Sequence, residues 1–212
     1  WSGELKITDK ATDIEIKSNL KGLGINLPPP FGKKKEEIRT LLFTKKAINE
    51  NQELVKVEIG TYASAKLTKE RDYDGVMKVK NGLITINSLE TKMPINGVML
   101  SAELPEVNLE SVNSLFSSLD SKSFITDTNI NIQDFNVYGY RLSNANIKYV
   151  PTNKNLSIQI TSNDVLGNIL WDKEENLLKA DFEKLHLKKN STLDNDENKF
   201  IFSNPPKINI KV

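Results

Sequence analysis

The stretch Val55-Lys56-Val57-Glu58-Ile59, continued after Gly60-Thr61-Tyr62 by Ala63-Ser64-Ala65-Lys66-Leu67, shows the pattern that decides the fold. Apolar and polar residues alternate in both halves, as in β-strands that turn one face to an apolar environment and the other to water. Alternating segments recur along most of the chain at the roughly 8–12-residue interval of antiparallel meanders. The sequence therefore predicts a mostly β protein.

Further alternating segments lie on both sides of this stretch. They predict strands at 14–16, 23–27, 38–48, 77–79, 84–86 and 98–104, and again at 130–137, 145–149, 156–160, 165–171, 178–187 and 208–212. Asn81-Gly82 is a strong hairpin signal, because both residue types accept a positive φ. One helix is expected over 109–119, where Asn108 is a suitable N-cap and apolar residues fall at helical spacing.

Composition excludes several classes of protein. The 212 residues carry 29 basic and 28 acidic side chains, a net charge of +1, whereas a nucleic-acid-binding surface needs a basic excess. Cysteine is absent, which excludes thiol catalysis, thiolate zinc sites and disulfides. The single histidine, His186, alternates with Leu185 and Leu187 and is expected to face solvent.

No sequence motif points to catalysis. Neither a Gly-x-Ser-x-Gly elbow nor a Walker sequence occurs. Asp72 and Asp74 lack the glycine and the distal glutamate of a calcium loop, so they predict a turn. Glu174 and Glu175 are adjacent and point apart, unlike a pair of catalytic carboxylates. We therefore expect no enzyme, with no catalytic, cofactor-binding or metal-binding residues and no cofactor.

The alternating apolar face has two interpretations. Strands of this kind either close a packed core or line an open trough, where each methylene that an acyl chain buries contributes ~0.8 kcal/mol. Alternation alone does not separate these two structures, and a packed core is the default. A one-residue slip in register would also exchange the inward and outward faces.

Three blocks of sequence resemble one known family. The most specific is Ile16-Lys17-Ser18-Asn19-Leu20-Lys21-Gly22-Leu23-Gly24-Ile25-Asn26-Leu27-Pro28-Pro29-Pro30-Phe31-Gly32-Lys33. It is similar to a signature of the YhdP family, which belongs to the AsmA-like superfamily and is related to TamB. The stretch 97–109 resembles a second element of that family, and 135–142 together with 167–171 resembles a third.

The resemblance implies a fold and a function. The fold would be a long, twisted antiparallel sheet curved into a taco-like groove, with one short helix near 109–119. The chain would be a single segment, 1–212, of a larger periplasmic protein anchored in the inner membrane. A sub-boundary near 105–125 and a polar loop at 190–198 are expected within it. The anchor would lie outside this sequence, since the chain starts at Trp1 with no signal peptide and has no run of ~18 apolar residues.

The implied function is movement of phospholipid between the inner and outer membranes along the groove by a monomer, without catalysis. The residues expected to contact acyl chains are Ile14, Ile16, Ile25, Val57, Ile59, Met77, Val79, Leu100, Ile130, Ile132, Ile158, Ile160 and Phe182. The residues expected to form structural turns are Pro28, Pro30, Phe31, Gly32, Asn81 and Gly82. The alternative is a β-sandwich module that binds another envelope protein and carries no lipid.

Overall fold

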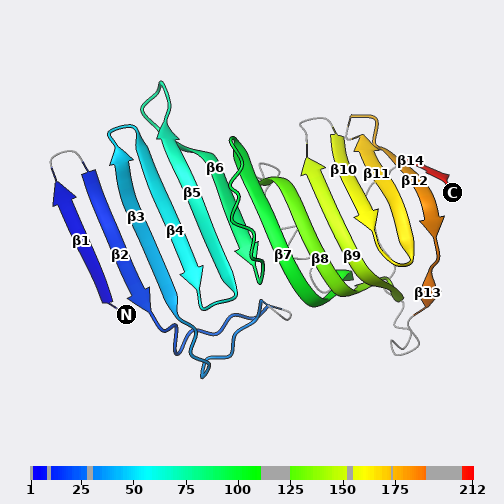
Figure 1. The fold of residues 1–212 in the computed structure, drawn as a ribbon, viewed down its shortest axis with the longest axis horizontal. Coiled ribbons are helices and arrows are strands. Elements are labelled where there is room, and N and C mark those ends of the chain that lie inside the picture. The colour runs from blue at the N-terminus through cyan, green and yellow to red at the C-terminus, as the bar shows by residue number, and fades with distance from the viewer. Residues whose placement is uncertain are drawn as a thin grey trace. The chain divides into compact units, whose positions relative to one another are not determined.

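The computed structural model describes residues 2–8, 11–27, 31–110, 125–151, 155–172, 174–189 and 207–212. These residues are nearly all in β-strands, which confirms the predicted class (Figure 1). The chain divides into two compact units, Trp1–Ala102 and Glu103–Val212. The boundary falls within one strand, Gly97–Asn108.

The first unit is a sheet of consecutive strands lying side by side (Figure 1). Its strands are β1 (Ser2–Thr8), β2 (Ala11–Ser18), β3 (Leu41–Asn49), β4 (Gln52–Ile59), β5 (Ala63–Arg71), β6 (Met77–Ile86) and the first half of β7 (Gly97–Asn108). Neighbours from β1 to β6 pair antiparallel. β6 and β7 pair parallel, because residues 87–96 return the chain so that Gly97 lies opposite Asn81.

The second unit contains the rest of β7 and a further meander. Its strands are β8 (Ile125–Val137), β9 (Tyr140–Pro151), β10 (Asn155–Thr161), β11 (Val165–Asp172), β12 (Leu177–Leu185), β13 (Lys188–Lys189) and β14 (Lys207–Lys211). Neighbours from β8 to β12 pair antiparallel, β13 pairs with β9, and β14 pairs parallel with β12. The strand order is open, since no pairing among the described strands joins β1 to β14.

Two expectations about local structure need correction, and two others fall wholly or mostly outside the described residues. The sheet is mixed rather than wholly antiparallel, because β6–β7 and β12–β14 are parallel pairs. Residues 23–27 form no strand, and only Ile25 makes an isolated bridge, to Lys33. Of the helix expected over 109–119, only Leu109 and Glu110 are described, and both are helical. The polar loop expected at 190–198 lies outside the described residues.

The predicted hairpin turn at Asn81-Gly82 is wrong, because both residues lie inside β6. The chain turns earlier, at Asp72, whose carboxylate accepts hydrogen bonds from the backbone N–H of Asp74 and of Val76. Gly82 has a different role in the strand. A Cβ there would lie 2.4 Å from Leu67 Cδ2, so the glycine leaves room for the leucine across the strand pair.

Candidate functional site

One face of the first sheet is apolar over three successive rows of residues. Cross-strand register defines this unit 1 apolar face, since residues opposite one another lie on the same side of a sheet. Its rows are Leu41, Ile59, Ala63, Ile86 and Ala102; Ile16, Phe43, Val57, Ala65, Ile84 and Leu100; and Ile14, Lys45, Val55, Leu67, Gly82 and Val98. Lys45, which lies between Ile14 and Val55 in the third row, is the one charged member of these rows.

Little of the unit 1 apolar face is buried as a protein core would be. Val98 is 0% exposed, whereas Ile16 is 37% exposed and Phe43, Val57 and Ile59 are half-buried. The extensive contacts among the described strands join sheet neighbours only, so no second layer of described strands packs on this face. Among the described strands, the unit 1 apolar face therefore belongs to a single layer.

The second unit carries a comparable face, the unit 2 apolar face. Its rows are Ile130, Ile147, Ile160, Gly167 and Phe182; Tyr149, Ile158, Ile169, Ala180 and Ile210; and Leu156, Trp171, Leu178 and Ile208. The members near the outer strand are the more exposed, with Trp171 at 37%, Ile210 at 58% and Ile208 at 62%.

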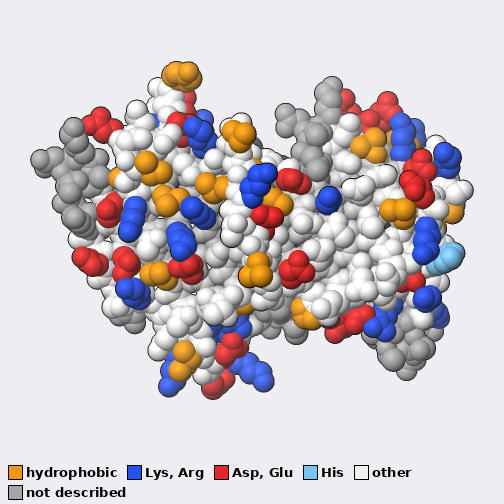
Figure 2. All heavy atoms as spheres, in the orientation of Figure 1, with side chains coloured by type: hydrophobic (Ala, Val, Ile, Leu, Met, Phe, Trp, Pro, Cys, Tyr) orange, Lys and Arg blue, Asp and Glu red, His pale blue; other side chains and the backbone are white. Residues whose placement is uncertain are grey.

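The opposite faces of both sheets carry many polar side chains, together with buried apolar ones such as Leu83 in unit 1 and Phe135 and Leu142 in unit 2. In unit 1, the Ser64 and Thr85 hydroxyls hydrogen-bond at 2.8 Å, and the Lys56 ammonium pairs with Glu58 at 2.7 Å. On the side of the molecule shown in Figure 2, acidic, basic and hydrophobic side chains are interspersed over β2 to β5. In unit 2, Asn146 Nδ2 donates to Asn131 Oδ1 at 2.6 Å, and Asn131 donates to Glu103 at 2.9 Å. The opposite faces are therefore the more polar ones, although they also bury apolar residues.

A charged cluster borders the unit 1 apolar face at one end. Glu53 lies between two lysines, with Oε2 2.9 Å from Lys45 Nζ and Oε1 3.1 Å from Lys69 Nζ. Partial burial raises the pKa of the Glu53 carboxyl, but hydrogen bonds and charge attraction from the two ammoniums outweigh it, so the pKa lies below its usual value. We call this set the Lys-Glu-Lys cluster.

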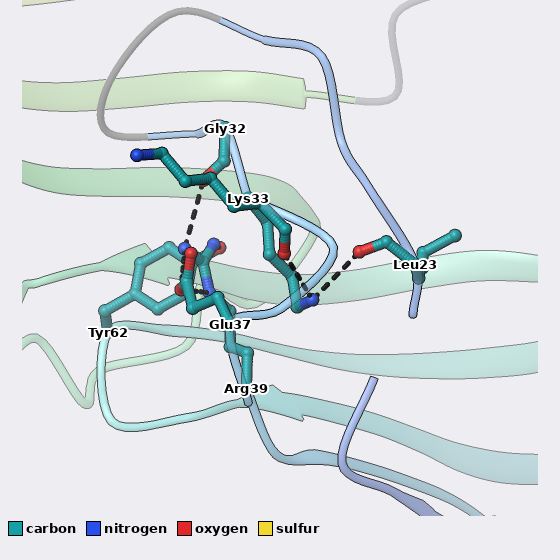
Figure 3. Close-up of polar contacts among 7 residues, drawn as sticks. Leu23, Gly32, Lys33, Glu37, Arg39 and Tyr62 are labelled. Carbon is teal, nitrogen blue, oxygen red and sulfur yellow. Dashed lines mark hydrogen bonds and ion pairs between the residues drawn. The ribbon is translucent and has the colours of Figure 1, made fainter. Parts of the chain in front are cut away.

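The loop between β2 and β3 lies at the other end of the same face (Figure 3). Ile25 and Lys33 in this loop pair antiparallel. Lys33 is 4% exposed, and its ammonium donates to the carbonyls of Leu23 at 2.8 Å and Lys34 at 3.0 Å. A Cβ on Gly32 would lie 2.4 Å from the Leu27 carbonyl oxygen, so this position requires glycine.

Arg39 anchors that loop to the turn between β4 and β5 (Figure 3). Its guanidinium donates to the Tyr62 hydroxyl at 2.9 Å and to the Gly32 carbonyl at 3.0 Å, and it lies 4.8 Å from the Tyr62 ring centroid. Glu37 accepts two further bonds from Arg39, at 2.9 and 2.5 Å. These contacts fix the loop at the strand end where Ile59 lies. Pro28 and Pro30 lie outside the described residues, and Phe31 and Gly32 come directly before Lys33.

The register places most of the predicted lining residues on the two apolar faces. The rows of the unit 1 apolar face contain Ile14, Ile16, Val57, Ile59 and Leu100, and those of the unit 2 apolar face contain Ile130, Ile158, Ile160 and Phe182. Met77 and Val79 lie beyond the unit 1 rows, opposite Arg71 and Lys69, and Ile132 is buried on the same side as Ile130. Ile25 lies in the loop and on neither sheet. Contact of these residues with lipid stays a prediction.

Sequence reasoning missed the Lys-Glu-Lys cluster and the buried Lys33. The cluster is brought together only by cross-strand register, because Lys45, Glu53 and Lys69 are far apart in the sequence. Lys33 begins a run of charged residues, Lys33 to Glu37, a composition that does not predict burial. The one available signal was that Glu53 and Lys69 take positions that an apolar residue would hold if the alternation of their strands continued.

Two further findings concern chemistry and membranes. Within the described residues, no group of three or more His, Cys, Asp or Glu side chains is placed to hold a metal ion. None of the helical structure described is long and apolar enough to cross a bilayer.

Comparison with known proteins agrees with the sequence blocks. No curated protein and no solved structure matches the chain. The family model described as YhdP protein matches residues 1–212, which is the whole sequence. The chain therefore belongs to the YhdP family.

Proposed function

We propose that this chain is a segment of a periplasmic protein, anchored in the inner membrane, that carries phospholipid between the inner and outer membranes. The acyl chains would lie on the apolar faces of its sheets, and the segment would act without catalysis or cofactor. Membership of the YhdP family supports a place in the cell envelope. The observation that carries the proposal is a one-layer sheet whose apolar face no described strand covers.

The size of the unit 1 apolar face suits an acyl chain. Leu41 and Lys45 are four residues apart, which is about 14 Å along a strand, and β3 to β7 span about 19 Å across it. Covering roughly 270 Å² of apolar surface contributes at most about 7 kcal/mol at 25 cal/mol per Å². That free energy is enough to hold a lipid chain and small enough to release it.

Lipid content of the purified full-length protein tests the proposal. The protein would be purified from envelope membranes in a mild detergent, and bound phospholipid would be quantified by mass spectrometry. We expect phospholipid in excess of that bound to an unrelated envelope protein purified in the same way. The alternative function, docking of a protein partner on the apolar faces, predicts background lipid and a stoichiometric protein partner after chemical cross-linking.

A further inference from the structure

The Lys-Glu-Lys cluster interrupts the alternation at a defined place. Lys45, Glu53 and Lys69 occupy the side of the sheet that Phe43, Val57 and the rest of the unit 1 apolar face occupy. The apolar rows therefore run from the Arg39 loop at one end to a charged margin at the other. A ligand that covers this face meets hydrocarbon along its length and charge at one end.

The charge at that margin is positive and accessible. The Glu53 side chain is 11% exposed, whereas those of Lys45 and Lys69 are 31% and 30% exposed. One carboxylate between two ammoniums leaves a net charge of +1. An ammonium has three N–H donors, so the bond to Glu53 does not exhaust either lysine.

We infer that the Lys-Glu-Lys cluster holds the phosphate of a phospholipid headgroup whose acyl chains lie along the unit 1 apolar face. This inference rests on the proposed function and adds an orientation to it. The apolar rows measure about 14 Å along β3, and half of a ~30 Å hydrocarbon core is about 15 Å, so one leaflet's chain length fits between cluster and loop. Lysine binds phosphate as a point charge, and Glu53 keeps the two ammoniums on this side of the sheet.

Photoreactive lipids test the orientation in the full-length protein. Two phosphatidylethanolamine probes would be used, one with a diazirine in the headgroup and one with a diazirine at the end of an acyl chain. The labelled peptides would be identified by mass spectrometry. We expect the headgroup probe to label the peptides around Lys45, Glu53 and Lys69, and the acyl probe to label those around Leu41 and Ile59.

Variants test the role of charge. Replacing both lysines (Lys45→Gln with Lys69→Gln) should lower headgroup labelling roughly fivefold, as loss of a partly exposed ion pair would. Glu53→Gln should raise it, because the carboxylate no longer competes with phosphate, and unfolding would not raise labelling. The matched control is Lys56→Gln with Lys66→Gln, a facing lysine pair on the polar side of β4 and β5, which should leave labelling unchanged.

The outcomes separate this inference from the proposed function. Equal labelling of both ends by both probes, or an unchanged signal in the lysine variant, would overturn the orientation while lipid binding stands. Absence of label with both probes would overturn the proposed function itself.

Discussion

A negative charge at the centre of the unit 1 apolar face should remove bound lipid while the protein stays folded. Val57 lies in the middle row, between Phe43 and Ala65 in register, and is half-buried. In Val57→Asp, the carboxylate keeps much of its water in the free protein. An acyl chain lying over it would strip that water, and burying an unpaired charge costs several kcal/mol.

The magnitude follows from the size of the face. A penalty of about 3 kcal/mol, taken from the roughly 7 kcal/mol that the apolar face contributes, lowers lipid affinity more than about 100-fold. The assay is phospholipid per mole of purified full-length protein by mass spectrometry, with circular dichroism to confirm folding. We expect lipid at background and a strand spectrum like that of the wild type.

A matched control lies three residues away on the same strand. Leu54 is also half-buried but belongs to the opposite side of β4, beside Lys46 and Thr68. Leu54→Asp introduces the same charge and should leave lipid content unchanged. Equal loss of lipid in both variants, or unfolding of Val57→Asp alone, would refute the reasoning, because Val57 would then be a core residue.

Three further predictions concern stability. Gly82→Ala should destabilise the β5–β6 pair by about 1–3 kcal/mol, because the added Cβ would overlap Leu67 and force a shift. Backbone hydrogen exchange in these two strands should become faster, and an unchanged exchange rate would contradict the prediction. Tyr62→Phe should lower the free energy of unfolding by about 1 kcal/mol, because the Tyr62 hydroxyl no longer accepts a hydrogen bond from Arg39. Backbone hydrogen exchange in the loop between β2 and β3 should become faster. Equal exchange rates in the variant and the wild type would contradict the anchoring role of this contact. The pKa of Glu53 is lower in the folded protein than in the unfolded chain, so the ionised carboxylate stabilises the fold above the unfolded pKa, and this contribution is lost as the pH falls through the folded pKa. In Glu53→Gln, the free energy of unfolding should therefore fall less between neutral and acidic pH than in the wild type. An identical fall in both proteins would contradict this prediction.

Much of the sheet could be predicted from the sequence because alternation is a local property. The alternation at Val57 and Ile59 predicts both a strand and a shared face of the sheet, and the observed register confirms that they lie in β4 on the same face. The same reasoning expected Asn81 and Gly82 to turn. They do not, because the carboxylate of Asp72 and the positive φ of Gly75 already close the hairpin. The turn at residues 72–76, stabilised by the Asp72 side chain, thus forms in place of the turn that Asn81-Gly82 predicted.

Features set by distant contacts were beyond sequence reasoning. The parallel pairing of β6 and β7 depends on a return connection, 87–96, that contains no helix of the kind usual between parallel strands. The burial of Lys33 depends on carbonyls that only the folded loop brings together. The family signature includes Lys33, but the hydrogen bonds of its ammonium to backbone carbonyls could be identified only from the structure.

The most direct test of lipid passage is a photo-crosslinking scan along one strand of the full-length protein in living cells. A photoreactive amino acid would be placed at each position from Leu54 to Ile59 in turn, and phospholipid adducts would be measured by mass spectrometry. Lipid passage along the unit 1 apolar face predicts adducts with a period of two, at Val55, Val57 and Ile59 but not at Leu54, Lys56 and Glu58. Labelling without this period, or adducts with protein alone, would contradict it.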